Sequence, residues 1–176
     1  MILLCTACNW VLKSNSTEKK HIEVVRYDRL ESRYLTTGDF SALQEMNTEY
    51  AIETKTLIEN VLNLGAVYEP GINSTLLNYY QDTTLQKLIA DVEEQYSDME
   101  DVNQDLTKAF TKAKKEIKNI TIPTIYTQIG AFDQSIIVGE QTIGISLDKY
   151  LGADYPLYQK YYHANQRATM AREYIT

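Results

Sequence analysis

The fold is decided by residues 122–152, which read IPTIYTQIGAFDQSIIVGEQTIGISLDKYLG. Three short runs within this stretch, at 122–130, 134–140 and 142–152, are rich in β-branched residues and carry glycines at or near their ends. Such runs, separated by glycine, are typical of strands that are joined by turns. We therefore expect strands here, the last two forming a hairpin that turns at residues 139–141.

The last of these runs alternates in character, as a strand with two different faces does. Apolar side chains alternate with small or polar ones along it, namely Ile143, Ile145 and Leu147 with Gly144, Ser146 and Asp148. The apolar face must be covered, and the amphipathic patterns at 85–96 and 102–117 predict helices that would cover it. The expected fold class is therefore α+β, with helices packed on one side of a small, mainly antiparallel sheet.

The chain before residue 122 has mostly helical patterns. Besides the two amphipathic helices, a long helix is expected from about Ser41 to Gly65 and a short one over 74–80. Residues 21–29, HIEVVRYDR, predict a first strand instead, and Pro156 predicts the start of a last helix. Three capping boxes are expected to begin helices, formed by the pairs Ser41 and Gln44, Thr83 and Gln86, and Ser97 and Glu100.

The composition limits the classes of protein to consider. The chain has 176 residues, of which 44% are hydrophobic and 23% are charged, and its net charge is −7. These values predict one globular domain and argue against disorder. The negative charge makes nucleic acid or an anionic membrane face a poor partner for the domain as a whole. No run in the sequence reaches the ~18 apolar residues that a membrane-spanning helix needs.

The first ten residues, MILLCTACNW, contain the two cysteines of the chain, Cys5 and Cys8. A redox pair would lie between a strand and a helix in a βαβ unit, and no such pattern follows. A zinc half-site would need further ligands, and the histidines of the chain are His21 and His163 alone. Both interpretations are therefore weaker than a third.

The third interpretation is a bacterial lipoprotein box, in which a short apolar run and small residues precede a lipidated cysteine. Ile2, Leu3 and Leu4 supply the apolar run, Thr6 and Ala7 the small residues, and Cys8 follows. Two features depart from the usual pattern, because Cys5 stands where leucine is common and a positively charged n-region is missing. We predict that Cys8 carries the lipid and anchors the chain to a membrane.

This interpretation divides the chain into three parts. Residues 1–8 are a partial lipoprotein signal, residues 9–20 a polar tether, and residues 21–176 a single α+β domain. The predicted localisation is the bacterial cell envelope, with the domain facing the periplasm. Asn9 follows the anchor in place of the aspartate that retains lipoproteins in the inner membrane of well-studied bacteria, which favours the outer membrane.

Candidate chemical sites are few. The sequence contains neither an HExxH motif nor GxSxG, and it has no glycine-rich phosphate loop. His21 and His163 are expected to face solvent, and Asp148 is the best candidate for a role beyond packing. We therefore predict no catalytic residue, no metal, no cofactor and no small-molecule substrate.

Several segments of the β-rich half resemble one known family, the gliding-motility lipoprotein B (GldB-like) family of Bacteroidetes. The matching positions are those of its strand, hairpin and "REYI" motifs: Ile125 to Gly130, Phe132, Ile136 to Val138, Ile143 to Gly152, Tyr155 to Tyr158, and Arg172 to Ile175. The resemblance is close over about 120–176 and loose over the helical half. The segment 143–158 is its most specific part.

The resemblance implies a non-enzymatic, membrane-anchored component of a gliding-motility or secretion assembly. Members of the family usually continue beyond the REYI segment, so the resemblance implies a chain that is a fragment or truncated copy, incomplete at its C-terminus. The family's layout is similar to zinc metallopeptidases, so the alternative is a zincin-like fold without its catalytic helix, acting as a degenerate or incomplete hydrolase. Gly144, Ser146 and Asp148, or the edge beside them, are expected to contact another envelope protein unless further chain covers this face.

Overall fold

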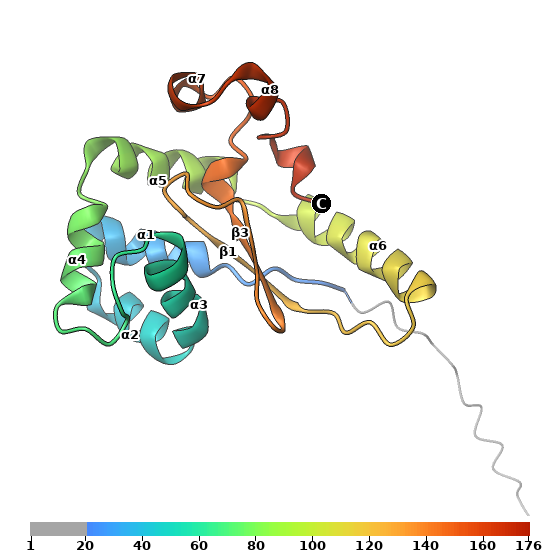
Figure 1. Cartoon of the computed structure of the whole chain (residues 1–176), viewed down its shortest axis with the longest axis horizontal. Helices are drawn as coiled ribbons and strands as arrows, with labels where there is room; N and C mark the ends of the chain where they lie inside the picture. Colours follow the sequence, from blue (N-terminus) through green and yellow to red (C-terminus); the bar gives the residue numbers. More distant parts are fainter. Residues whose placement is uncertain (1–20) are drawn as a thin grey trace, which may run out of the picture.

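The computed structural model describes residues 21–176, and Figure 1 shows helices grouped around a small sheet. Its helices are α1 (Tyr27–Thr37), α2 (Phe40–Thr48), α3 (Ala51–Lys55), the π-helix η1 (Thr56–Val61), α4 (Ile72–Tyr79), α5 (Thr83–Gln95), α6 (Glu100–Glu116), the 3₁₀ turn η2 (Leu147–Lys149), α7 (Pro156–Tyr161), α8 (Ala164–Arg167) and the 3₁₀ turn η3 (Arg172–Tyr174). Between residues 21 and 176, no helix combines the length and the apolar character needed to cross a bilayer.

The sheet has three strands, β1 (Thr124–Gln128), β2 (Ile136–Val138) and β3 (Thr142–Ser146), in the order β1-β3-β2. The predicted hairpin is confirmed, because β2 and β3 pair antiparallel and the Gly139 N–H donates to the carbonyl of Thr142 at 2.8 Å. However, β1 pairs parallel to β3. The fold class is α+β as expected, but the sheet is mixed and not mainly antiparallel.

The predicted first strand is mostly wrong. Only Val25 makes a bridge, parallel to Tyr126 of β1, and the chain turns into helix α1 at Tyr27. Tyr27, Leu30 and Tyr34 are buried at helical spacing, and Gly38 ends the helix with a left-handed φ of 71°. The β-branched residues of this segment misled the strand prediction, because the helical spacing begins only after them.

The helix starts differ from the predicted capping boxes. Asp39 caps α2 by accepting hydrogen bonds from the backbone of Ser41 and Ala42, and Asp82 caps α5 in the same way. These aspartates lie outside the S/T-x-x-Q pattern, and their carboxylates accept more strongly than a hydroxyl. The long helix expected from residue 41 is also interrupted at Glu49 and Tyr50, and continues as α3 and η1.

Helices lie against the sheet at more than one place. Helix α1 contacts β1 directly, and α5 contacts the turn η2 that follows β3. Helix α6 holds the segment before α1, since Asn103 Oδ1 accepts from the Val24 N–H at 3.0 Å. Of the two helices predicted to cover the sheet, α5 reaches the turn after β3 and α6 holds the segment before α1, whereas α1, which was not predicted, packs on β1.

Tyrosine supplies much of the buried core. Tyr27, Tyr80, Tyr96, Tyr126 and Tyr158 are among the largest fully buried side chains of the described residues. A buried phenol needs a hydrogen-bond partner, and the hydroxyls of three of them each donate to a backbone carbonyl at 2.5 Å. These bonds tie helices to loops and lead to the site described next.

Candidate functional site

The polar centre of the structure is the loop of residues 129–133, which follows β1 and is called here the clamped loop. Ala131 and Phe132 in this loop have φ values of 49° and 69°, in the left-handed region that side chains other than glycine rarely adopt. Such a conformation persists only when surrounding contacts hold it. Those contacts come from α1, from η2, and from the residues that directly follow α4 and α7.

Two buried carboxylates hold the amides of the clamped loop. Glu31 of α1 accepts from the Ile129 N–H at 2.8 Å. Asp148 of η2 uses both of its oxygens, accepting from the Gly130 N–H at 2.7 Å and from the Phe132 N–H at 2.6 Å. Glu31 and Asp148 are both fully buried. Backbone donors therefore replace the water that a carboxylate normally binds.

The carbonyls of the same loop are held by side-chain donors. Tyr80 donates to the Ile129 carbonyl, and Lys149 donates through Nζ to the Phe132 carbonyl at 3.0 Å. Tyr162 donates to the same Phe132 oxygen at 2.9 Å, and its ring centroid lies 4.6 Å from Lys149 Nζ. The clamped loop is thus fixed from both its donor and its acceptor side.

Burial controls the protonation of the two carboxyl groups. Desolvation raises the pKa of Glu31 well above its usual value, and nearby Asp28 and Asp148 raise it further, against the lowering effect of the Ile129 N–H. Desolvation also raises the pKa of Asp148, while the amides of Phe132 and Gly130 oppose the shift. One oxygen of Glu31 has no hydrogen-bond partner. This environment favours a neutral Glu31.

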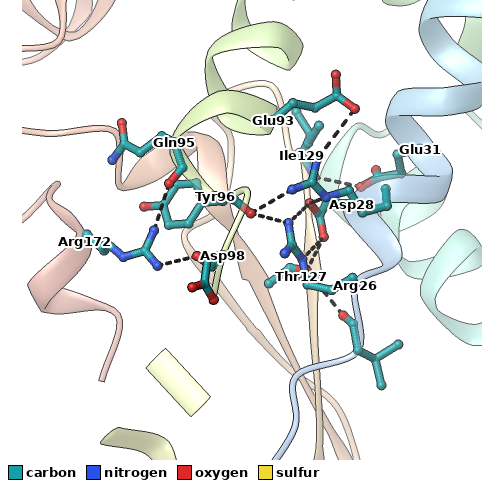
Figure 2. Close-up of polar contacts among 12 residues, drawn as sticks. Arg26, Asp28, Glu31, Glu93, Gln95, Tyr96, Asp98, Thr127, Ile129 and Arg172 are labelled. Carbon is teal, nitrogen blue, oxygen red and sulfur yellow. Dashed lines mark hydrogen bonds and ion pairs between the residues drawn. The ribbon is translucent and has the colours of Figure 1, made fainter. Parts of the chain in front are cut away.

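A second polar network joins α1 to the end of α5, as Figure 2 shows. Asp28 is buried and accepts two hydrogen bonds from Arg26, at 2.9 and 2.8 Å, and one from the hydroxyl of Thr127. Arg26 and Arg29 each donate to the Tyr96 carbonyl at 2.8 Å. Cations at these free carbonyls complement the negative end of α5.

Arg172 of the REYI segment approaches the same helix end from the other side (Figure 2). It donates to the carbonyls of Gln95 and Asp98, at 3.0 and 2.6 Å, and makes a two-bond ion pair with Asp101. Its guanidinium lies 4.8 Å from the ring centroid of Tyr96. The REYI segment is a 3₁₀ turn, and its arginine fastens the C-terminal segment to the junction of α5 and α6.

The residues predicted to contact a partner are buried within the described chain. Ser146 accepts from Gln128 Nε2 at 3.1 Å, Asp148 holds the clamped loop, and Gly144 lies under the ring of Tyr126. A Cβ added to Gly144 would be 2.6 Å from that ring. The expectation that this face is open to a partner is therefore wrong, because β1 and its side chains already cover it.

The free edge of the sheet belongs to β2 instead. Ile136 and Val138 are 40% and 77% exposed. Ser135 and Gly139 bond to β3, and bonded residues alternate along an antiparallel pair, so the backbone groups of Ile136 and Val138 point away from β3. The other predicted site residue, Cys8, lies outside the described residues.

Sequence reasoning missed Glu31 and Lys149 and identified Asp148 only as a candidate. Glu31 stands three residues after Asp28, and this spacing on a helix with buried apolar neighbours is the signal that would have found it. Lys149 directly follows Asp148 in η2. Neither contact partner is near in sequence, since Glu31 and Ile129 are separated by 98 positions.

The arrangement favours structural use of these side chains. The carboxylates of Asp28, Glu31 and Asp148 are buried and directed to named donors of the same chain. Among residues 21–176, no three histidine, cysteine, aspartate or glutamate side chains are grouped so as to hold a metal ion. What the site does chemically is to hold a strained loop rigidly beside the sheet.

The comparisons with known proteins identify one family. The sequence model of the family described as gliding motility protein GldB matches residues 12–176. No curated protein and no solved structure shows a significant match. The match covers the helical half as well as the β-rich segments whose geometry is described above. The chain therefore belongs to the GldB family of gliding motility proteins.

Proposed function

We propose that this protein is a lipid-anchored, non-enzymatic component of a gliding-motility assembly in the bacterial cell envelope. The observation that carries the proposal is the family match over residues 12–176. The side chains that hold the clamped loop support the non-enzymatic part, because Glu31, Asp148 and Lys149 are engaged by backbone groups of the loop. Complementation tests the role: in a gliding host whose own copy is deleted, the wild-type gene should restore spreading. Failure of a well-expressed, correctly located protein to do so would contradict it.

The anchor of this proposal is Cys8, and a matched variant is available three residues away. With a complete secretory signal in front of the box, Cys8→Ser should abolish labelling by radioactive palmitate and release the protein from the membrane fraction. Cys5→Ser should leave both unchanged. Labelling that survives Cys8→Ser, or that disappears only in Cys5→Ser, would show that the box has been misassigned.

We place the anchored protein at the outer membrane, facing the periplasm, on the ground of Asn9. Separation of the two membranes on a density gradient tests this assignment. The wild-type protein should sediment with outer-membrane markers. Asn9→Asp should move it to the inner membrane in a host that uses aspartate as the retention signal, and Asn9→Ser serves as the control.

The partner contact that we propose is the outer edge of β2, in place of the buried residues Gly144, Ser146 and Asp148. An extended segment of another envelope protein would add there as a strand, using the free backbone groups of Ile136 and Val138. Val138→Lys should reduce cross-linking to that protein in intact envelopes. Ile52→Lys, which adds the same charge to a residue of α3 that is 68% exposed, should not. Equal cross-linking in the two variants would rule out this edge.

A further inference from the structure

The second half of helix α6 lies largely outside the core. Its first half buries Val102, Asn103 and Leu106, but no residue of α6 after Leu106 is buried. Figure 1 shows α6 projecting away from the sheet. We call residues 108–118 the basic arm. Because no element of the described chain covers this part of the helix, packing against the rest of the domain does not explain its amino-acid composition.

The basic arm is strongly positive in an acidic protein. It contains five lysines, Lys108, Lys112, Lys114, Lys115 and Lys118, against one acidic residue, Glu116, although the whole chain has a net charge of −7. Lys108 pairs with Asp105 at 2.6 Å, and none of the other four makes an ion pair with any residue in 21–176. Lys114 and Lys115 alone would complement the end of the helix. The charge therefore exceeds what the helix itself requires.

The basic arm is also amphipathic. Phe110, Ala113 and Ile117 follow one another at intervals of three and four residues, so they lie on one side of the helix. Phe110 and Ala113 are half-buried, and Ile117 is 55% exposed. A helix with an apolar stripe flanked by lysines has the character of a segment that lies in the headgroup region of a membrane.

The start of the described chain runs along α6 towards this arm. The Val24 N–H donates to Asn103, and the Ile22 N–H donates to Thr107 Oγ1 at 2.9 Å, one helical turn closer to the arm. Following the chain back from Val24 therefore leads towards the basic arm. Cys8 lies thirteen positions before His21. A chain of that length reaches at most about 45 Å when fully extended.

We propose that the basic arm docks on the anionic phospholipid headgroups of the membrane that holds the Cys8 lipid. The lysines would contact lipid phosphates, and Ile117 would enter the boundary with the acyl chains, while Phe110 packs against the core. This inference rests on the anchor in the proposed function, which brings the arm within reach of the surface. Its consequence is an orientation: the arm faces the lipid, and the clamped loop is held at a fixed height above it.

Vesicle binding tests the proposal without the anchor. The full chain carrying Cys8→Ser is sedimented with vesicles of phosphatidylcholine alone or with one-third phosphatidylglycerol. Each lysine near an anionic surface contributes about fivefold in partitioning. Lys114, Lys115 and Lys118 all changed to Gln should therefore lower binding to the anionic vesicles more than tenfold. The matched control changes Lys55, Lys87 and Lys160, which are exposed elsewhere, to Gln and should lower it less than threefold.

A second comparison examines the apolar stripe. Ile117→Ser should weaken binding to the anionic vesicles severalfold, and Ile52→Ser should leave it unchanged. High salt should release the wild-type chain, and zwitterionic vesicles should not bind it. Equal losses in the two triple variants, or no binding of the wild-type chain to anionic vesicles, would overturn the proposal. Either result would leave the Cys8 anchor standing, because palmitate labelling tests that separately.

Discussion

Glu31 and Asp148 hold adjacent amides of one loop, yet they use their oxygens differently. Asp148 accepts with both oxygens, whereas Glu31 accepts with one and leaves the other without a partner. An amide side chain has one oxygen that accepts hydrogen bonds and one NH₂ group that donates them. It can therefore replace a carboxyl group only where one of the two carboxyl oxygens accepts no hydrogen bond. The two positions should therefore respond in opposite ways to the same chemical change.

Asp148→Asn should destabilise the fold by about 2–4 kcal/mol, because its NH₂ group would face a buried N–H of the clamped loop. The free energy of unfolding, measured with urea at neutral pH, checks this value. Asp133→Asn, at the exposed end of the same loop, is the control and should change it by less than about 0.5 kcal/mol. A loss below that in Asp148→Asn would mean that the two amide contacts contribute little.

Glu31→Gln should instead reduce the pH dependence of stability. The pKa of Glu31 is raised in the folded state by burial, so the folded protein binds more protons than the unfolded chain above about pH 4.3. Stability from this group is therefore greatest in acid and falls as the pH rises towards its folded pKa. The variant should match the wild type near pH 4 and become relatively more stable at higher pH. A difference that does not change with pH would contradict a neutral Glu31.

Strand β3 is an element with two covered faces, which its alternating sequence did not indicate. Ile145 and Leu147 are buried as expected, and Ser146 is buried as well. A parallel neighbour supplies the second cover: Gln128 stands opposite Ser146, and Tyr126 opposite Gly144. The small residues of β3, Gly144 and Ser146, thus leave the space that the large side chains of β1 occupy.

Both Ile145→Asp and Ser146→Arg should prevent stable folding, because each buries a charge that has no partner. Circular dichroism and thermal melting report the loss. Val138→Arg introduces the same group as Ser146→Arg on the exposed edge strand of the same sheet, and should melt within a few degrees of the wild type. A Ser146→Arg protein as stable as Val138→Arg would mean that the Ser146 face can open.

At the scale of the whole molecule, the sequence predicted the helices and strands better than it predicted which of them pack together. The hairpin, α5, α6 and Pro156 at the start of α7 followed from local patterns and are confirmed. Local patterns did not predict that α1 packs on β1, because that contact joins residues about 100 positions apart. Asp148 was recognised as unusual, but its contacts with Gly130 and Phe132, 18 and 16 positions away, leave no local pattern in the sequence.

The absence of metal chemistry stays a prediction for the whole chain. His21 begins the described segment, and His163 precedes α8, where its N–H donates to the side chain of Gln166. Two histidines so placed do not make the three-ligand site of a zinc hydrolase. Elemental analysis of the full chain, purified without a histidine tag, should find zinc well below one per molecule. One tightly held zinc per chain would reopen the metallopeptidase alternative.

The contact of α1 with β1 also determines when the protein can finish folding. A chain is made from its N-terminus, so α1 exists before the strand that supplies hydrogen-bond donors to its carboxyl groups. Asp28 and Glu31 must wait for Thr127 and Ile129, which are 99 and 98 residues later. Until those residues emerge, Asp28 and Glu31 lack the Thr127 hydroxyl and the Ile129 N–H, although Tyr27 and Tyr34 can already reach Thr54 and Asn73. Docking of α1 on β1 is therefore a late step, and a chain interrupted before residue 129 leaves Asp28 and Glu31 without these partners.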